Sequence, residues 1–201
     1  MTTDKKQLIL DTVLQLVKQT GFYHLNMKAI AEQAGIAAGT IYLYFKSKEE
    51  LINELYRSIV GEFNEAVLQS YQPNAAVYPN FEAMLRSAVG FYLTRKDFFS
   101  FVEQYTYAPF LFKESQDENF SLLLPMYKLM RIGKKQKIIK NIPDVVLIAL
   151  VHGPLNTILK MHFAHKLNLT QKSIQKRFIQ AVWEAISVPA IPVQPTDPSN
   201  L

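Results

Sequence analysis

Five of the six lysines in the first fifty residues are the side chains best placed to bind an anion. All of them fall at the ends of helices expected from the hydrophobic pattern: Lys5, Lys6, Lys28, Lys46 and Lys48. Ammonium groups clustered at helix ends can face the phosphates of a nucleic acid. The same placement is common on a solvated protein surface, so the lysines alone leave both interpretations open.

Other chemistries have weaker support. The chain has no cysteine, which excludes disulfides, cysteine-ligated zinc, iron–sulfur clusters and thiol catalysis. His162 and His165 are three residues apart, but no carboxylate lies between them, and polar surface or pocket lining is the better interpretation. The sequence shows no Gly-rich phosphate loop and no Ser/His/Asp spacing that stands out. We therefore expect no metal site, no cofactor and no enzyme.

The composition is that of a folded protein. The 201 residues are 49% hydrophobic and 19% charged, which excludes a disordered chain. Lys and Arg number 22 against 17 Asp and Glu, but the excess of +5 is spread along the chain and says little about nucleic acid. The longest apolar run, Val145–Val151, is far shorter than the roughly 20 residues of a membrane span. The N-terminus does not resemble a signal peptide, so we expect a cytoplasmic protein with no membrane partner.

Hydrophobic residues recur with helical spacing from end to end, which predicts an all-α fold. The expected helices cover residues 4–20, 27–34, 38–45, 48–70, 80–94, 97–108, 117–131, 144–166 and 171–187. Their expected N-caps are Asn26, Ser47, Asn80, Asp97, Asp144 and Thr170. Pro125 and the pair Gly153-Pro154 should kink or interrupt their helices. Residues 188–201 hold four prolines and are expected to form an extended or disordered tail.

The second and third expected helices have the outline of a helix-turn-helix. Gly35 lies at their junction, where a positive φ is needed, and Ala31 is small enough for the helices to cross closely. The second helix of such a pair presents its outer face to the major groove. The residues expected on that face are Ala38, Gly39, Thr40 and Leu43, whereas Ile41 and Phe45 should point inward.

Residues 26–51 closely resemble the DNA-binding domain of TetR-family transcriptional regulators. The most specific part is Gly39-Thr40-Ile41-Tyr42-Leu43-Tyr44-Phe45-Lys46-Ser47-Lys48-Glu49-Glu50-Leu51, and the resemblance covers about residues 8–56. It implies a three-helix DNA-binding domain over 1–47, a larger helical ligand-binding and dimerisation domain over 48–187 and a Pro-rich tail over 188–201, with helix 48–70 connecting the two domains.

By position, the resemblance also implies which residues contact DNA: Asn26, Lys28, Ala38, Gly39, Thr40, Tyr42, Leu43, Tyr44, Lys46 and Lys48. Two departures from the family's usual sequence matter. Ala37 replaces the Ser or Thr that often caps the recognition helix, and the recognition face lacks the Arg, Asn and Gln that make bidentate base contacts. We expect Thr40 to read thymine methyls and groove shape, with phosphate contacts supplying most of the affinity.

Nine aromatic residues between positions 91 and 112 exceed what a helical core needs, which suggests an aromatic-walled cavity or, alternatively, extra core and dimer surface. The resemblance implies a small effector in such a cavity, and the expected contacts are Phe91, Tyr92, Phe99, Glu103, Tyr105, Tyr107, Phe110 and Met126. Glu103 and Asp97 could pair with a cationic ligand, whereas Arg86, Arg95 and Arg131 could serve an anion. The sequence does not choose between them.

Apolar surface on the last two expected helices predicts a four-helix dimer interface. Two recognition helices about one DNA turn apart would then read a palindromic operator in double-stranded DNA. The resemblance implies a transcriptional repressor that a small, hydrophobic or aromatic effector releases from DNA. The alternative is an all-α sensor or carrier of small molecules in which DNA binding is vestigial.

Overall fold

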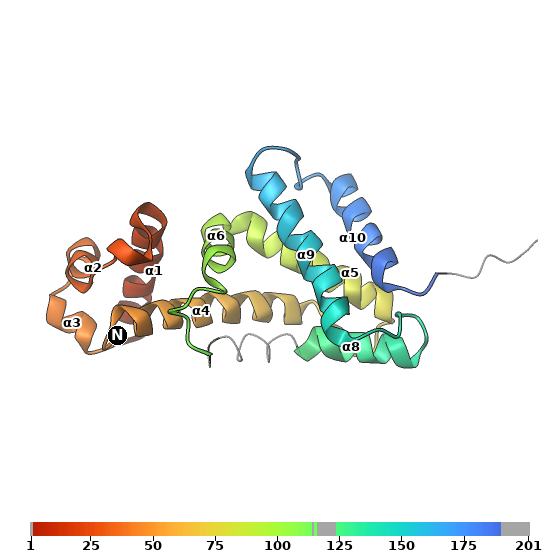
Figure 1. Ribbon diagram of the computed structural model, residues 1–201, viewed down its shortest axis with the longest axis horizontal. Coiled ribbons are helices and arrows are strands. Elements are labelled where there is room, and N and C mark those ends of the chain that lie inside the picture. The colour runs from red at the N-terminus through yellow and green to blue at the C-terminus, as the bar shows by residue number, and fades with distance from the viewer. Residues whose placement is uncertain (1, 114, 116–123, 190–201) are drawn as a thin grey trace, which may run out of the picture.

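The computed structural model describes residues 2–113, 115 and 124–189, and over this range the chain is helical with no extended strand. The expected all-α fold is therefore confirmed. Figure 1 shows an elongated molecule with α1–α3 gathered at one end, α5 and α8–α10 toward the other, and α6 between them over the middle of α4. The long helix α4 runs between the two groups.

The first group contains α1 (Thr2–Thr20), a single 3-10 turn η1 (Phe22–His24), α2 (Met27–Ala34) and α3 (Ala38–Tyr42). Asn26 caps α2 as expected, because its side-chain oxygen accepts a hydrogen bond from the Ala29 N–H at 2.8 Å. Gly35 ends α2 with φ of 65°, a left-handed conformation that favours glycine. Asn26 thus fixes the start of α2, and Gly35 allows the turn between α2 and α3.

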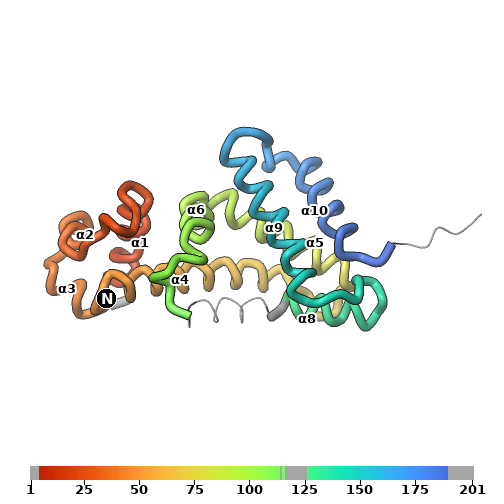
Figure 2. Tube along the Cα trace, viewed as in Figure 1, coloured from red at the N-terminus to blue at the C-terminus, as the bar shows by residue number. Residues whose placement is uncertain are grey.

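Helix α4 (Lys48–Gln69) begins where the sequence predicts. The Ser47 hydroxyl accepts from the Glu50 N–H at 3.1 Å, and the Glu50 carboxylate accepts from the Lys46 N–H at 2.7 Å. With 22 residues the helix is about 33 Å long. It is therefore long enough to contribute to both halves of the molecule, as Figure 2 also shows.

The second group contains α5 (Val77–Thr94), α6 (Lys96–Tyr105), α8 (Leu124–Lys135), α9 (Asp144–Phe163) and α10 (Lys172–Ile186). Helix α5 lies at its centre and contacts α4, α6, α8, α9 and α10. A single antiparallel bridge between Ile139 and Ser187 joins the α8–α9 loop to the end of α10.

Helix α5 starts at Val77, earlier than expected, so the prediction that Asn80 caps it is wrong. The Asn80 amide instead accepts from the Gln72 N–H and donates to the Gln72 and Ala75 carbonyls, closing the loop before the helix. Pro79 lies in the first turn, where its missing N–H costs nothing.

Three further caps were predicted wrongly. The residues at the N-cap positions of α6, α9 and α10 are Arg95, Pro143 and Gln171, not the expected Asp97, Asp144 and Thr170. The two aspartates lie in the first turn of their helices, where the positive end of the helix dipole favours a carboxylate. Asp97 pairs with Lys18 at 2.8 Å, and Asp144 pairs with Lys134, whose hydrogen bond holds the pKa of Asp144 below its ordinary value.

Two proline expectations fare differently. Helix α9 continues unbroken through Gly153-Pro154, so the expected interruption is wrong. Neighbouring turns hold the helix, because Leu147, Val151, Leu155 and Leu159 are all buried. Pro125 is the second residue of α8, and the segment that it should separate lies at 116–123, outside the described residues.

Helix α3 ends at Tyr42, short of the expected 45. Within the expected tail, residues 190–201 also lie outside the described residues.

Buried side chains form two hydrophobic cores, both of which include residues of α4. The first core holds α1–α3 and the first half of α4. It also includes Phe101 and Tyr105 of α6 and Leu111 from the segment that follows α6. The second core holds Val67 of α4 together with α5, α8, α9 and α10. The DNA-binding end predicted by the sequence is thus attached to the rest of the protein along α4 and the end of α6.

An ion pair between α1 and α4 should make the stability of the first core depend on pH. Lys6 and Arg57 both donate to Glu54. Burial raises the pKa of Glu54, but these two partners outweigh it and hold the pKa below the ordinary 4.5. A group with a lowered folded pKa stabilises the protein above its unfolded pKa and loses that contribution as pH falls.

We therefore expect Glu54→Gln to lower the free energy of unfolding by up to about 1 kcal/mol at pH 7, a size typical of a partly exposed pair. The difference from the parent protein should shrink as the pH falls below 4.5 and should be lost once Glu54 is protonated in the folded protein. Urea unfolding at these pH values measures it. Glu65→Gln, on the exposed side of the same helix, is the control and should show no such pH dependence. A constant difference at all pH values for Glu54→Gln would contradict the prediction.

Candidate nucleic-acid interface and apolar cavity

Helix α3 presents an outward face of small and apolar side chains. Ala38 and Gly39 are exposed, Thr40 is half-buried, and Leu43, just after the helix, is 83% exposed. Ile41 is fully buried beneath them, and Phe45 is buried just beyond the helix, as expected. The face predicted to contact bases is therefore open to solvent, and the inward residues hold the short helix against the first core.

Hydroxyl and ammonium groups flank this face. Tyr42 is 57% exposed and Tyr44 half-buried, while Lys28 and Lys46 are exposed. Lys28 has an ion pair with Glu32 at 3.8 Å, but both side chains are largely in water, so the pair is weak and leaves Lys28 available. The exposed cap Asn26 lies at the start of α2. All ten residues predicted to contact DNA thus belong to one end of the molecule.

Lys48 is held differently from the other lysines. Its ammonium lies over the ring of Phe22, 4.6 Å from the ring centroid, which is within the range of a cation–π contact. Phe22 in turn stacks on Phe110, with ring centroids 3.6 Å apart and ring planes 18° apart, and Tyr23 meets Phe110 edge-on. A residue from the segment after α6 therefore supports the position of Lys48.

The buried amide of Asn53 fixes that segment on α4. Asn53 is 0% exposed. Its nitrogen donates to the carbonyls of Glu49 (2.8 Å) and Phe110 (3.0 Å), and its oxygen accepts from the Phe112 N–H (2.7 Å). A single side chain thus satisfies backbone groups on both sides of Leu111, which is itself buried in the first core.

The structure does not bring the eight residues predicted to bind the effector into one cavity. Phe91, Tyr92 and Phe99 stack with neighbouring rings in the second core, and Tyr105 and Phe110 pack against the first core. Glu103 pairs with Lys160 on the surface, and Tyr107 is 92% exposed. Met126 alone of the eight lines the cavity described next.

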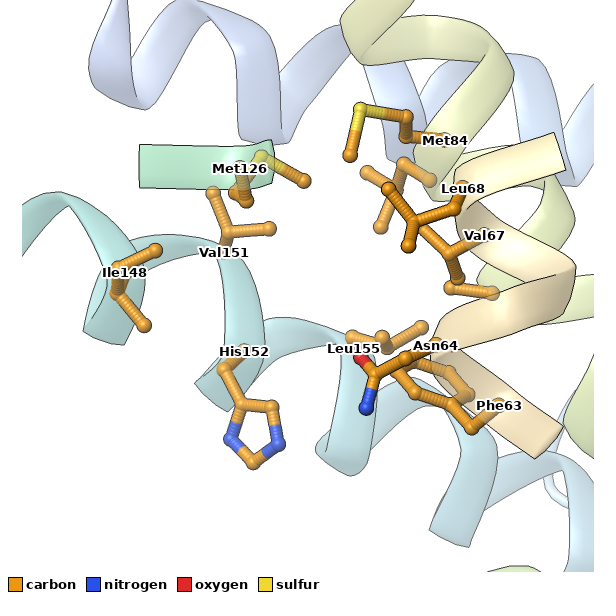
Figure 3. A pocket seen from close by; sticks show the side chains of 12 residues that line it. Phe63, Asn64, Val67, Leu68, Met84, Met126, Ile148, Val151, His152 and Leu155 are labelled. Carbon is orange, nitrogen blue, oxygen red and sulfur yellow. The ribbon is translucent and has the colours of Figure 1, made fainter. Parts of the chain in front are cut away.

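An apolar cavity of about 60 Å³ lies between α4, α5, α8 and α9 (Figure 3). Its apolar lining residues are Phe63, Val67 and Leu68 of α4, Met84, Leu85 and Ala88 of α5, Met126 of α8, and Ile148, Val151 and Leu155 of α9. Two polar side chains, Asn64 of α4 and His152 of α9, complete the lining. None of the described residues around the cavity is charged.

Sequence reasoning missed the residues that α4 and α9 contribute to this cavity. One signal was present: Asn53 and Asn64 interrupt the apolar face of α4, and both are buried. Of the two histidines three residues apart, His162 lies near the end of α9 and accepts from the Leu169 N–H at 3.3 Å through Nδ1, whereas His165 lies in the turn after the helix. In the described part of the chain, no group of three or more potential metal ligands is found.

Comparison with known proteins identifies both halves of the chain. Residues 9–55 match the model of the TetR family of bacterial regulatory proteins, and residues 56–188 match a tetracyclin repressor-like C-terminal domain. The chain is 35% identical over 71 residues to the fatty acid metabolism regulator protein of Bacillus subtilis, a match covering 35% of this chain and 37% of that protein. An uncharacterized HTH-type transcriptional regulator of Haemophilus influenzae is 27% identical over 107 residues, 53% of this chain and 57% of the relative. The matches to these curated relatives span little more than half of their length at most.

Solved structures extend the likeness to nearly the whole chain. A putative TetR-family regulator from Shewanella sp. PV-4 is 25% identical, with a TM-score of 0.84 and coverage of 92% of this chain and 99% of the other. The regulator FadR from Bacillus subtilis in complex with stearoyl-CoA has a TM-score of 0.74 over 90% of this chain and 98% of the other. At 17% identity the FadR likeness shows the fold alone.

The Asn53 amide yields a test of how the two halves are joined. Asn53→Ala leaves the Phe110 carbonyl and the Phe112 N–H without their partner in a buried place, at about 1–3 kcal/mol for each group. We expect the free energy of unfolding to fall by roughly 2–4 kcal/mol in urea titrations. Asn26→Ala, which removes one exposed cap, should cost about 1 kcal/mol. Equal losses for the two variants would contradict the role given to Asn53.

Proposed function

The chain belongs to the TetR family of bacterial regulatory proteins, and we propose that it is a homodimeric DNA-binding regulator of transcription, acting as a repressor that a small apolar effector releases. The observation that carries the proposal is the solvent-exposed outer face of α3, flanked by Tyr42 and Lys48. None of the relatives named above is described as an enzyme. Action on chromosomal DNA would place the protein in the cytoplasm.

In this proposal α3 enters the major groove, which is just wide enough for a helix. Ala38, Gly39 and Thr40 offer methyl groups, one hydroxyl and exposed backbone, but no bidentate donor. Bases are then read through thymine methyls and groove shape, and the phosphate contacts of Tyr42 and Lys48 supply most of the affinity.

Apolar surface on α9 supports a dimer. Leu147, Val151, Leu155 and Leu159 are buried in the protomer, whereas Val145, Val146 and Met161 are exposed. By length and composition α9 could also cross a membrane, which is weak evidence because core helices of soluble proteins pass the same test. A second copy of the chain, packed on α9 and α10, would cover this surface.

The same dimer would carry two recognition helices and so favour a palindromic operator. A line of small exposed residues, Ala149, Gly153 and Thr157, would let the two copies of α9 approach closely.

The cavity between α4, α5, α8 and α9 is the proposed effector site. Helix α4 contributes both to this cavity and to the first core, so a ligand that favours one position of α4 would also favour one position of α3. The names of two relatives support a chain-shaped effector, since one is a fatty acid metabolism regulator and the other was solved with stearoyl-CoA.

The second candidate is an all-α sensor or carrier of small molecules whose DNA binding is vestigial. The observation in its favour is the absence of Arg, Asn and Gln from the outer face of α3. A shift assay on DNA upstream of the protein's own gene separates the candidates, because a carrier would bind that DNA no better than unrelated duplex.

Substitutions at the DNA-binding end should separate phosphate contacts from base contacts. We expect Lys48→Ala to weaken binding to all duplexes about equally and to reduce the slope of log affinity against log salt by about 1, because one phosphate contact is lost. Tyr42→Phe should also lower the binding affinity for all DNA sequences by about the same factor. Thr40→Val should instead change the order of preference among operator variants.

Fluorescence anisotropy from 50 to 300 mM salt measures these effects. Lys135→Ala, at the exposed C-terminal end of α8 and far from α3, is the control and should change neither affinity nor slope. Parent affinity that does not respond to salt would defeat the proposed binding mode.

The dimer has its own test at Gly153. A Cβ built at Gly153 meets no atom within 4 Å in the protomer, so Gly153→Leu should leave the folded protomer intact and obstruct only a partner helix. We expect sedimentation to change from dimer to monomer at micromolar concentration, with far-UV circular dichroism unchanged. Gly61→Leu, at another open position on α4, is the matched control and should remain dimeric. A dimeric Gly153→Leu protein would place the interface elsewhere.

A further inference from the structure

We propose that the cavity receives the uncharged, hydrogen-bond-donating end of a slender apolar ligand, such as a primary alcohol, and that the oxygen of Asn64 accepts that hydrogen bond. The inference concerns what the cavity binds. It rests on the proposed function only for the consequence that binding would have on DNA.

The orientation of the Asn64 amide is fixed by the protein. The side chain is 5% exposed, and its nitrogen donates to the Val60 carbonyl at 2.7 Å. Turning the amide over would place two oxygens against each other, so the nitrogen must face Val60. The oxygen is left on the cavity side (Figure 3), and no donor among the described residues is found for it. The oxygen borders the cavity and is not sealed inside the protein, and a ligand that donates to it forms a hydrogen bond in apolar surroundings, where such a bond is electrostatically stronger than in water.

The rest of the lining restricts the ligand. His152 is the other polar residue of the lining, and Figure 3 shows it and Asn64 on the side away from Met84 and Met126, with the His152 ring pointing away from both methionines. His152 is exposed to solvent on one side, and partial burial lowers its pKa, so its ring is neutral near pH 7 and offers one donor and one acceptor. A hydroxyl group can donate to Asn64 and accept from a ring N–H such as that of His152.

An anionic end does not fit this site. An ionised carboxylate would face the Asn64 oxygen with no Lys or Arg among the described lining residues, and an unpaired buried charge is strongly unfavourable. A thioester has acceptors but no donor, so it would also leave Asn64 unsatisfied. The ligand end that enters must therefore be neutral and carry an O–H or N–H group.

The volume sets the shape. At about 60 Å³ the cavity has room for roughly four to six water molecules, well below the 300–1,000 Å³ typical of sites for drug-sized ligands. A cavity of about 150 Å³ holds one benzene ring, so this smaller cavity can receive only the hydroxyl end and the first few carbons of an alkyl chain, and a fused ring system does not fit. We choose an eight-carbon alcohol as the probe, and the rest of its chain would lie outside the cavity.

The test compares two isomers that differ only in hydrogen-bond donation, 1-octanol and 1-methoxyheptane, with octanoate at pH 8 as the charged analogue. Binding is followed by NMR of ¹³C-methyl methionine, because Met84 and Met126 line the cavity while Met27 and Met161 lie outside it. We expect 1-octanol to shift the Met84 and Met126 signals and to bind about three- to tenfold more tightly than the ether, as one hydrogen bond of about 1 kcal/mol implies. Octanoate should bind more weakly than either.

Asn64→Leu should reduce the ratio between alcohol and ether to about one while leaving ether binding intact or improved. Gln69→Leu, an amide exchanged on the exposed side of the same helix, should keep the parent ratio. The inference is overturned if the two isomers bind the parent protein equally, if octanoate binds best, if no probe binds, or if Met27 and Met161 shift as much as Met84 and Met126. The isomer comparison in the parent protein holds even if Asn64→Leu fails to fold. No DNA enters these measurements, so failure of the proposed regulation is seen separately.

Discussion

The hydrogen bonds of Asn53 are the constraint on which the relation between the two ends of the molecule depends. Helix α4 belongs to both hydrophobic cores, but a helix alone does not fix what packs against it. The Asn53 amide holds the backbone of Phe110 and Phe112, so the segment after α6 cannot leave α4 without exposing a buried amide and two backbone groups. That cost makes the end of α6 part of the first core, although it belongs to the second half of the chain.

The same segment reaches a side chain proposed to contact DNA. Phe110 stacks on Phe22, and Phe22 lies beneath the Lys48 ammonium. Aromatic pairs contribute about 0.5–1.5 kcal/mol and exposed cation–π contacts about 0.5–1 kcal/mol. The coupling energies of allosteric proteins are typically about 1–3 kcal/mol. Contacts in series transmit no more than the weaker of the two, so this path could carry at most about 1 kcal/mol, the lower end of that range.

Local signals in the sequence predicted most of the fold and the outward face of α3. Asn26, Gly35 and Ser47 act within a few residues of themselves, so their spacing alone predicts the turns they form. Asp97 and Asp144 were misassigned because their charge partners, Lys18 and Lys134, come from other helices. Asn80 was misassigned because its amide closes the loop before α5, which a capping pattern does not reveal. The number of aromatic residues could not predict the cavity. A sequence has the same aromatic content whether the rings fill a core or line a cavity. The better indicator was a polar residue, Asn64, on an otherwise apolar helix face.

Two features of the protein are consistent with each other. Helix α3 has few side chains that could hold bases strongly, and the cavity is small. A five-residue helix is too short to be stable alone, and Ala37 gives it no side-chain cap, so burial of Ile41 and Phe45 must hold it in place. Its outer residues offer no bidentate donor, so in the proposed binding mode one half-site alone would bind weakly, and a dimer would need both half-sites at the correct spacing. Such an affinity would be sensitive to a small rotation of α4. Under the proposed regulation, a ligand that occupies only about 60 Å³ would then be sufficient to weaken DNA binding.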